Sequence, residues 1–270
     1  MTDLLRYDGK RTIVTGAASG MGAETAKLVS ALGGEVFALD VKQPSVEVTK
    51  FLRVDLSDPD AIDAAVESIG GPIDALFNCA GLPNTFPGQQ VMAVNFLGHR
   101  HLTERVAPLM PAGGAIGFIS SVGGMNFMSH MAELAELTAI EDFAAAKAWC
   151  ESHDELIAEG YSFSKEAIVY YTMQRSGSLL REGKRINCIS PGPTDTAMMP
   201  AFEQAMGKDY MDTFPKPIGR NARAEEQAYP LVFLNSPAAS YISGHNLMVD
   251  GGFLAAIMTG QIDPAAIMPS

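Results

Sequence analysis

The chain has 270 residues, of which 47% are hydrophobic and 19% are charged, and its formal net charge is −12. These values are typical of a folded globular protein, and a single α/β domain of this length buries a full core. A net negative charge of this size repels phosphate backbones and anionic lipids, so we expect no nucleic-acid partner and no membrane partner. Residues 1–10 lack an apolar run of signal-peptide length, and the three cysteines (Cys79, Cys150 and Cys188) are far apart. We therefore expect a cytoplasmic protein with free thiols.

Short apolar runs recur along the chain, and each is followed by a helical pattern. The first run, Thr12–Thr15, precedes the helical segment Ala23–Leu32. The other predicted strands are, in chain order, Glu35–Leu39, Phe51–Val54, Ile73–Phe77, Ala115–Ile119, Arg185–Ile189 and Asn246–Val249. Strands that alternate with helices predict a Rossmann-like, doubly wound parallel sheet of about seven strands, with helices on both faces. We expect one such domain over residues 1–270, with its ligands bound beyond the carboxyl ends of the strands.

The loop after the first strand, Thr15–Gly22, has the glycine spacing GxxxGxG. Gly16, Gly20 and Gly22 allow a sharp turn and a close approach to a pyrophosphate, which the free amides of the next helix would bind. Ser19 and Met21 lie in the same loop and are predicted cofactor contacts. Three glycines alone also fit a plain tight turn.

An acidic residue, Asp40, ends the second predicted strand. A carboxylate at this place accepts hydrogen bonds from the ribose hydroxyls and repels a 2′-phosphate, so the sequence predicts NAD rather than NADP. Lys42 is the nearby cation, and we expect it to be solvated. Asp55 and Leu56 follow the third strand and either flank the adenine or simply begin the next helix.

Tyr161 and Lys165 are four residues apart, so on a helix their side chains share one face. Free tyrosine titrates near pH 10, and a neighbouring ammonium favours the phenolate. Lowering the pKa by about three units requires roughly 4 kcal/mol of differential stabilisation. A pair of this kind is also common on ordinary helix surfaces.

Six motifs follow one another in an order that is known from one family. They are Thr15–Gly22, Asn78–Gly81, Asn95, Ile119–Ser121, Tyr161–Lys165 and Pro191–Gly192, and the segment Ser243–Gly252 closes the series. From about residue 8 to 253 the chain resembles the classical short-chain dehydrogenases/reductases (SDRs). The resemblance implies an NAD-dependent oxidoreductase acting on CH–OH groups, which interconverts an alcohol and a ketone or aldehyde. A short Gly81–Asn95 spacing and a long Ser121–Tyr161 spacing are similar to those of 3α-hydroxysteroid dehydrogenase/carbonyl reductases and coniferyl alcohol dehydrogenases.

The resemblance also implies roles for the matching residues. Tyr161 is the general acid/base, Lys165 lowers its pKa and holds the nicotinamide ribose, and Asn95 anchors a water in the proton relay. Ser121, rather than Ser120, hydrogen-bonds the substrate oxygen. The remaining implied cofactor contacts are Pro191, Gly192, Thr194 and Thr196 at the nicotinamide and Asn78, Ala80 and Gly81 along the adenosine half. Relatives assemble as dimers or tetramers, partly through the helices that follow Asn95 and Tyr161, so we expect a homo-oligomer.

Two segments depart from the usual pattern. Residues 122–160 are predicted to be helical, with capping boxes at Thr138–Glu141 and Ser152–Glu155. These residues include eight acidic side chains and one basic side chain, Lys147. The acidic side chains form either a solvated helix face or a wall that disfavours anionic substrates.

The Met- and Phe-rich segment 194–219 is predicted to be a mobile lid over a bulky apolar substrate (hydroxysteroid-like or aromatic), although simple packing also explains it. The apolar tail Phe253–Ser270 is expected to pack on a neighbouring subunit.

The same residues give less support to three other interpretations: a metal site, a non-catalytic protein and an enoyl reductase. His99 and His101 are two apart and point different ways, so we predict no metal site. A non-catalytic nucleotide-binding or assembly protein would usually lose one of the four catalytic residue types, and all four are present. An enoyl reductase usually has six residues between the tyrosine and the lysine, and here there are three.

Overall fold

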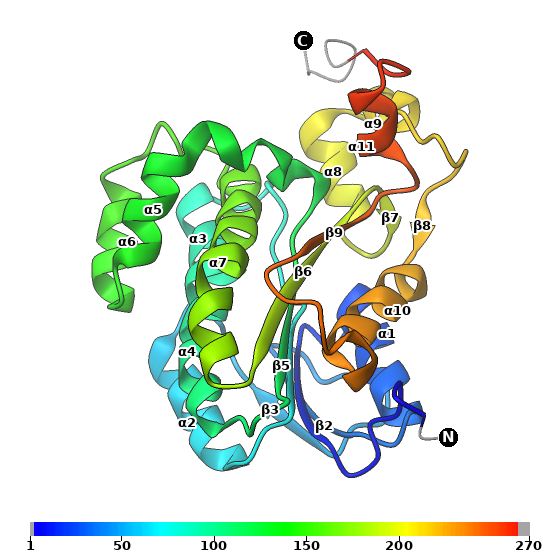
Figure 1. The fold of residues 1–270 in the computed structure, drawn as a ribbon. Coiled ribbons are helices and arrows are strands. Elements are labelled where there is room, and N and C mark those ends of the chain that lie inside the picture. Colours follow the sequence, from blue (N-terminus) through cyan, green and yellow to red (C-terminus); the bar gives the residue numbers. More distant parts are fainter. Residues whose placement is uncertain (1–2, 264–270) are drawn as a thin grey trace.

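The structure is a computed structural model that describes residues 3–263. Among these residues, seven parallel strands form one sheet in the order β3-β2-β1-β4-β5-β6-β9 (Figure 1). The strands are β1 (Arg11–Thr15), β2 (Glu35–Asp40), β3 (Lys50–Arg53), β4 (Ala75–Asn78), β5 (Ala115–Ile119), β6 (Arg185–Pro191) and β9 (Asn246–Val249). The predicted doubly wound sheet is confirmed. The chain reverses its direction across the sheet between β1 and β4, and ligands of such sheets bind at this switch point.

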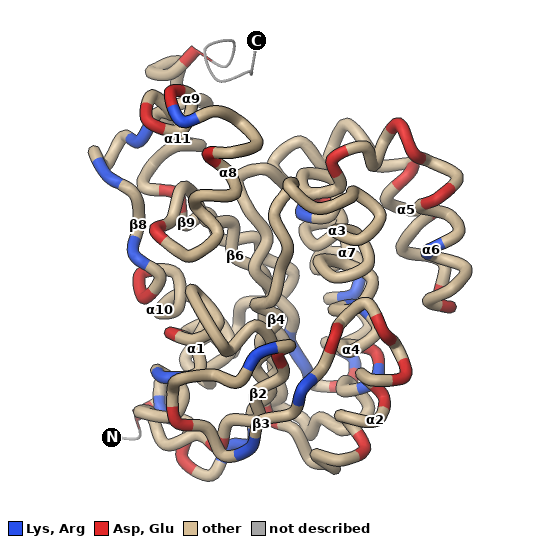
Figure 2. Tube along the Cα trace, turned by 180° about the vertical axis from the view of Figure 1, so that it is seen from behind, with Lys and Arg blue, Asp and Glu red and all other residues tan. Residues whose placement is uncertain are grey.

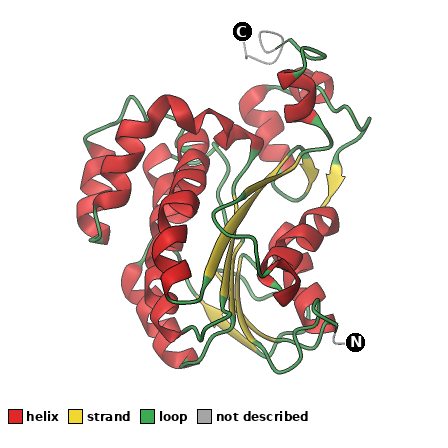
Figure 3. Ribbon diagram, viewed as in Figure 1, coloured by secondary structure: helices red, strands yellow, loops and turns green. Residues whose placement is uncertain are grey.

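Helices cover both faces of the sheet (Figure 3). Helices α2 (Pro59–Ile69), α4 (His99–Val106) and α7 (Tyr161–Arg181) lie on one face, and α1 (Gly20–Ala31) and α10 (Ala224–Asn235) lie on the other. Because successive strand residues point to opposite faces, Ile13 packs in the core beneath α2, α4 and α7, while Val14 packs in the core beneath α1 and α10. This alternation explains why short apolar runs without internal polar residues form buried strands here.

The remaining elements are short, and most of them lie in the loops that follow the carboxyl ends of the strands, whereas η2 (Ala107–Leu109) and η4 (Pro237–Ala239) lie at the amino ends. The others are α3 (Gly88–Met92), the π-helical turn η1 (Ala93–Gly98), η3 (Val122–His130), α5 (Met131–Ala139), α6 (Phe143–Glu151), β7 (Thr194–Asp195), α8 (Met199–Met206), α9 (Lys208–Thr213), β8 (Ala222–Arg223) and α11 (Phe253–Met258). Residues 264–270 of the expected apolar tail lie outside the described residues. Within residues 3–263, no helix is both long enough and apolar enough to cross a membrane.

The inserted residues 122–160 are helical, but both predicted capping boxes are wrong. Thr138 lies in the last turn of α5, where its hydroxyl donates to Leu134 O, and α6 begins instead after Asp142, whose carboxylate accepts from Ala145 N. Ser152 ends α6 rather than starting a helix. The motif S/T-x-x-E failed because a threonine hydroxyl also bonds the preceding turn of its own helix.

The insert lies along the outer side of α7 (Figure 1), and Figure 2 shows acidic positions along its helices α5 and α6 and the turns beside them. Trp149 of α6 stacks on Phe163 of α7 with 6.2 Å between ring centroids. His130 Nδ1 lies 2.6 Å from a carboxylate oxygen of Glu166, which is buried. Seven of the eight acidic residues are exposed, and Glu133 is half-buried. This placement favours a solvated helix face over a wall at the site.

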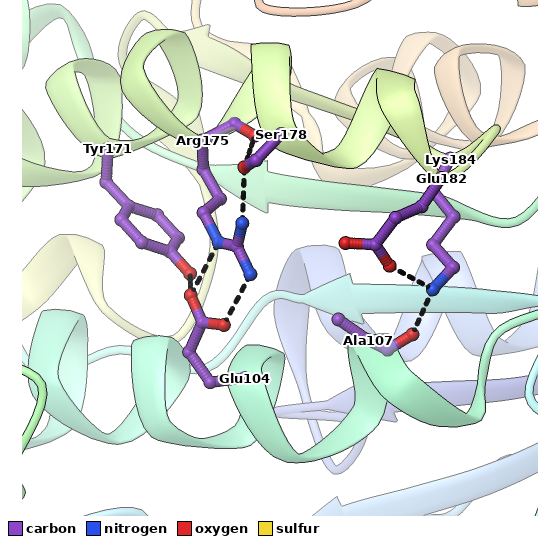
Figure 4. A network of polar contacts seen from close by, with 7 residues as sticks. All are labelled: Glu104, Ala107, Tyr171, Arg175, Ser178, Glu182 and Lys184. Carbon is purple, nitrogen blue, oxygen red and sulfur yellow. Dashed lines mark hydrogen bonds and ion pairs between the residues drawn. The ribbon is translucent and has the colours of Figure 1, made fainter.

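Further along α7, a polar network joins it to α4 (Figure 4). The carboxylate of Glu104 accepts from Tyr171 Oη at 2.6 Å and from both Nε and Nη2 of Arg175 at 2.8 Å. Arg175 also donates to Ser178 Oγ. This bidentate arrangement fixes the two helices to one another, and α4 and α7 begin next to the two residues on which the catalytic prediction depends, Asn95 and Tyr161.

Candidate active site

The loop between β1 and α1 packs closely against the end of β4. Gly16 has φ +68°, and a Cβ atom at this position would lie 2.7 Å from Ala80 Cα. A Cβ atom on Gly22 would lie 2.2 Å from Gly16 O. The hydroxyl of Thr15 accepts from the amides of Cys79 and Ala80 at 2.9 and 3.1 Å. These contacts bring the start of α1 and the Asn78–Gly81 segment together, and they leave room only for glycine at positions 16 and 22.

Ser19 and Met21 both lie at the start of α1. Ser19 is its N-cap in an extended conformation, and Met21 packs partly buried on the core beneath α1. An open helix N-terminus beside a glycine turn is a binding place for an anion such as a pyrophosphate.

Asp40 lies at the end of β2 and reaches toward the glycine loop. Its Oδ2 accepts from Ala18 N at 2.9 Å, and its Oδ1 accepts from Lys42 N at 2.9 Å. The carboxylate is therefore fixed beside the loop, whereas the exposed side chain of Lys42 points to solvent. Asp55 is bound differently, since its Oδ1 accepts from both the amide and the hydroxyl of Ser57. Asp55 thus forms a turn ahead of α2, and its contact with an adenine stays a prediction.

Asn95 and Asn78 hold the segments around the switch point. Asn95 Oδ1 accepts from Leu82 N at 2.7 Å, and its Nδ2 donates to Leu82 O at 3.0 Å and to Ser164 Oγ at 3.3 Å. Asn95 therefore connects the loop after β4 with α7. Asn78 Nδ2 donates to Thr103 Oγ1 at 3.2 Å, and its buried Oδ1 has no partner among the described residues. A water held by Asn95 stays a prediction.

His99 links this region to the first strand, and the sequence did not indicate it as a site residue. Its Nδ1 lies 3.1 Å from Asn95 O, and its Nε2 lies 3.0 Å from Thr15 Oγ1. Since Asn95 O can only accept, Nδ1 carries the ring proton, and in the neutral imidazole Nε2 accepts from the Thr15 hydroxyl, whose other acceptor, Phe77 O, lies farther away at 3.5 Å. Burial lowers the pKa of His99 to about 3. Its position four residues after Asn95, on the same helix face, is the signal that could have found it.

Tyr161, Ser121 and Lys165 come together where β5 ends and α7 begins. The Ser121 hydroxyl hydrogen-bonds the Tyr161 phenol and also accepts from Gly123 N at 3.1 Å. Lys165 is buried, its Nζ donates to Ile119 O at 2.9 Å, and it lies 5.5 Å from the centroid of the Tyr161 ring. Ser120 instead donates to Lys165 O at 2.8 Å and supports the helix backbone. The arrangement follows the order Ser121, Tyr161, Lys165 that the motifs predict.

The electrostatics of this cluster differ from the sequence expectation. The pKa of Tyr161 is raised to about 12, first because of burial and further because of the Glu159 carboxylate, while the Ser121 hydrogen bond lowers it. Burial also lowers the pKa of Lys165 to about 8. The predicted lowering of the tyrosine pKa by Lys165 is therefore not found in the chain itself, since desolvation raises this pKa and it is Ser121, not Lys165, that opposes the rise.

The segment after β6 approaches the glycine loop from the other side. Gly192 N donates to Val249 O at 3.2 Å, and Thr194 Oγ1 donates to Gly192 O at 2.9 Å. A Cβ atom on Gly20 would lie 3.4 Å from Thr196 Cγ2. Pro191 ends β6 beside these residues. The predicted nicotinamide and pyrophosphate segments therefore meet at Gly20 and Thr196, and the residues of both segments fit a nicotinamide dinucleotide.

The family is shown by comparison with known proteins. Residues 10–133 match the family model described as short chain dehydrogenase, and residues 157–254 match one described as enoyl-(acyl carrier protein) reductase. Coniferyl-alcohol dehydrogenase of Pseudomonas sp. (strain HR199) is 34% identical over 249 residues, which cover 92% of this chain and 98% of that protein. The chain is a classical SDR.

Another curated relative and one of the solved structures that are similar to this SDR are 3-alpha-hydroxysteroid dehydrogenases. The 3-alpha-hydroxysteroid dehydrogenase/carbonyl reductase of Comamonas testosteroni is 30% identical, over 92% of this chain and 98% of that protein. The crystal structure of 3-alpha-hydroxysteroid dehydrogenase from Pseudomonas sp. B-0831 with NADH has a TM-score of 0.78 and 28% identity, and it covers 94% of this chain and 100% of that one. A putative NAD(P)-dependent gluconate 5-dehydrogenase from Beutenbergia cavernae with NADP has a TM-score of 0.75 and 25% identity, with the same coverage. The first of these two solved structures contains NADH, and the second contains NADP.

In this SDR the short loop and the long insert are neighbours in space. Gln89 Nε2 donates to Cys150 O at 3.0 Å and to Asp154 Oδ1 at 2.9 Å, so α3 is fastened to the end of α6. A Cβ atom on Gly160 would lie 2.5 Å from Gly88 O. The backbone just before Tyr161 therefore rests directly on α3. The short loop and the long insert therefore pack directly on one another just before the catalytic helix.

The segment 194–219 reaches over the catalytic cluster. It contains α8 and α9, and Phe202 of α8 packs edge to face on the Tyr161 ring. Phe214, at its far end, packs on Phe253 of α11 with 4.8 Å between centroids. A cavity of about 300 Å³ lies under the return of the segment, between Pro193, Ile218 and Met248. The segment therefore lies where a lid over the substrate beside Tyr161 would lie. Its motion stays a proposal.

Proposed function

We propose that this SDR is an NAD-dependent dehydrogenase that interconverts an alcohol and a ketone or aldehyde on a bulky apolar molecule. The observation that carries the proposal is the convergence of Ser121, Tyr161 and Lys165 at the carboxyl end of β5, next to Asn95. The side chains present match the proton-transfer half of such a reaction.

In the oxidation direction, Tyr161 as the phenolate accepts the hydroxyl proton of the alcohol at Oη, and the hydride leaves the carbinol carbon for a bound nicotinamide, which gives the carbonyl. The Ser121 hydroxyl donates to the substrate oxygen and holds it beside the phenol. Lys165 is placed to donate to a ribose hydroxyl from beneath the Tyr161 ring, and Asn95 keeps the loop after β4 against α7. When bound, a nicotinamide supplies the hydride acceptor, and the positive charge of its oxidised form favours the phenolate. In reduction, the protonated phenol returns its proton to the carbonyl oxygen.

The preference for NAD rests on Asp40. Its carboxylate is fixed by two backbone amides at the end of β2, where a 2′-phosphate of NADP would meet a negative charge. The residues proposed to hold the cofactor are Gly16, Ser19, Gly20, Met21, Gly22, Asp40, Asp55, Leu56, Asn78, Ala80, Gly81, Tyr161, Lys165, Pro191, Gly192, Thr194 and Thr196.

The substrate class is proposed from the lid and from the relatives. Phe202 places an aromatic ring on the reacting tyrosine, and an apolar surface there suits a steroid or an aromatic alcohol. The printed activities of the two curated relatives concern coniferyl alcohol and a 3α-hydroxysteroid. Three residues separate Tyr161 from Lys165, which favours a CH–OH dehydrogenase over an enoyl reductase. We further propose a cytoplasmic homo-oligomer, a dimer or tetramer, in which the insert limits how far α7 takes part in subunit contacts.

The test is Tyr161→Phe, with NAD-linked oxidation measured over steroid, aromatic, terpenoid and aliphatic alcohols. We expect turnover of the best substrate to fall by roughly a thousandfold or more, because the proton acceptor is lost. The affinity for NAD, measured by fluorescence titration, should stay within about twofold of the parent since the ring remains. Comparable turnover in the variant would refute the proposal.

A further inference from the structure

The helix that carries Tyr161 and Lys165 is capped in an unusual way. Its N-cap is Gly160, which has no side chain to accept the first amides. Glu159 takes this role, since its Oε2 accepts from Tyr161 N at 3.2 Å and its Oε1 accepts from Ser162 N at 2.9 Å. The carboxylate is therefore fixed over the first turn of α7, immediately beside the reacting tyrosine.

A helix N-terminus normally favours negative charge near it. The unpaired amides of the first turn carry about half a positive charge, and this would stabilise a phenolate at the first residue of the helix. Glu159 occupies two of these amides and adds a full negative charge at the same place. Its charge thus opposes the effect that the open helix N-terminus would have on Tyr161.

The other charges around Tyr161 do not cancel this one. On α7 itself, Lys165 faces the tyrosine ring, and Glu166 is paired with His130 from the junction of η3 and α5. Helix α3 carries no charged residue, and Glu203 is the charged residue of α8, next to Phe202. Glu159 is exposed and has no ion-pair partner among the described residues. It is the one acidic residue of the insert that is bonded to the catalytic helix backbone at Tyr161.

We propose that Glu159 moves the pH range of catalysis upward by opposing the deprotonation of Tyr161, which adds to the effect of burial and favours the protonated phenol that carbonyl reduction needs. Glu159 is a positioning residue, because it acts through Tyr161 and touches no reacting atom. The inference rests on the proposed function, in which Tyr161 is the acid/base. It also gives the acidic insert a catalytic consequence that a solvated helix face lacks.

The experiment compares Glu159→Gln with the parent enzyme in alcohol oxidation across pH. The glutamine keeps an acceptor for the helix amides and removes the charge. We expect the rising limb of the plot of kcat/KM against pH to move to lower pH by about 0.5 to 1 unit. The reason is that removing one negative charge near the half-buried Tyr161 phenol makes its deprotonation easier. On that limb, kcat/KM then rises about three- to tenfold. Glu159→Asp, which keeps the charge, should retain the parent profile.

The matched control is Glu155→Gln, which makes the same charge change four residues earlier, at an exposed residue with no hydrogen-bond or ion-pair partner in the described chain. It should leave the profile within about 0.2 unit of the parent, because an exposed distant charge is screened. An ultraviolet difference titration of each variant, with and without Tyr161→Phe, reads the phenol directly. An unmoved Tyr161 titration in Glu159→Gln, or an equal shift in Glu155→Gln, overturns the inference. If Tyr161→Phe itself stays active, it is the proposed function that fails.

Discussion

The ring of Phe202 meets the ring of Tyr161 edge to face, with 5.2 Å between their centroids and an angle of 76° between their planes. Phe202 belongs to α8, about 40 residues further along the chain than the catalytic helix start. The contact covers the apolar side of the phenol while its hydroxyl bonds Ser121. Any substrate that reaches the hydroxyl therefore lies next to the Phe202 ring.

Phe202→Ala should raise KM for aromatic and steroid alcohols by about two- to tenfold, because an aromatic contact is worth roughly 0.5–1.5 kcal/mol. For a small aliphatic alcohol, KM should change by less than about twofold, since little surface is buried. Steady-state kinetics on both substrate classes measure the difference, and Phe202→Tyr, which keeps the ring, is the control. A lower KM for the bulky substrate in Phe202→Ala would mean that Phe202 obstructs the site rather than contacting the substrate.

Asp40→Ser should reduce the preference for NAD over NADP. The carboxylate is held in place by Ala18 N and Lys42 N, so its charge cannot move away from a 2′-phosphate. Its removal should lower KM for NADP by about tenfold or more, equal to roughly 1.4 kcal/mol, and raise KM for NAD because the ribose acceptor is lost. Kinetics with each cofactor at saturating alcohol give both values. An unchanged ratio of the two kcat/KM values would remove Asp40 from the cofactor site.

The parts of the protein that sequence predicts well are those set by local pattern. The β5 and β9 strands begin and end where predicted. For β5 the reason is that a parallel strand buried throughout needs apolar residues on both faces, whereas β9 is a half-buried edge strand. The adjacency of Ser121 and Tyr161 follows from the order of the motifs. The predictions that were wrong concern features that depend on tertiary contacts. The helix starts in the insert were misplaced, and the raised pKa of Tyr161 comes from burial and from Glu159, which no residue spacing reveals.

His99 should make the protein sensitive to acid. Its pKa is lowered from 6.5 to about 3 in the folded chain, so below pH 6.5 the unfolded state binds a proton that the folded state refuses. The stability contributed by neutral His99 is therefore lost as pH falls from about 6.5 toward 3, by up to about 1.4 kcal/mol per pH unit. Urea unfolding at several pH values measures this slope.

His99→Gln should be less stable near pH 7, because the link between Asn95 O and Thr15 is weakened, but its stability should fall less steeply in acid. His101→Gln is the control, since His101 lies near the surface and bonds Asp63 Oδ1 at 2.8 Å. Equal acid slopes in the parent and in His99→Gln would show that other groups govern acid unfolding.

The contact between Gly88 and Gly160 should couple the insert to catalysis. Gly160 has φ +65°, and a Cβ atom there would lie 2.5 Å from Gly88 O and 2.7 Å from Gly88 Cα. Gly160→Ala therefore adds a clash to an unfavourable backbone conformation, and the start of α7 has to move. We expect a loss of about 2–5 kcal/mol of stability and a fall in kcat of roughly tenfold or more, because Tyr161 shifts relative to Ser121.

Gly9→Ala separates the two causes. Gly9 lies in the turn closed by Lys10 N and Tyr7 O and also has a positive φ, +68°, but a Cβ atom there meets no described atom within 4 Å. This variant should lose only about 1–2 kcal/mol and keep the parent kcat, because it carries the backbone penalty without the clash. Chemical unfolding and single-turnover kinetics on both variants give the comparison. If the two variants lose the same stability and the same activity, the docking of α3 beneath Gly160 does not position the catalytic tyrosine.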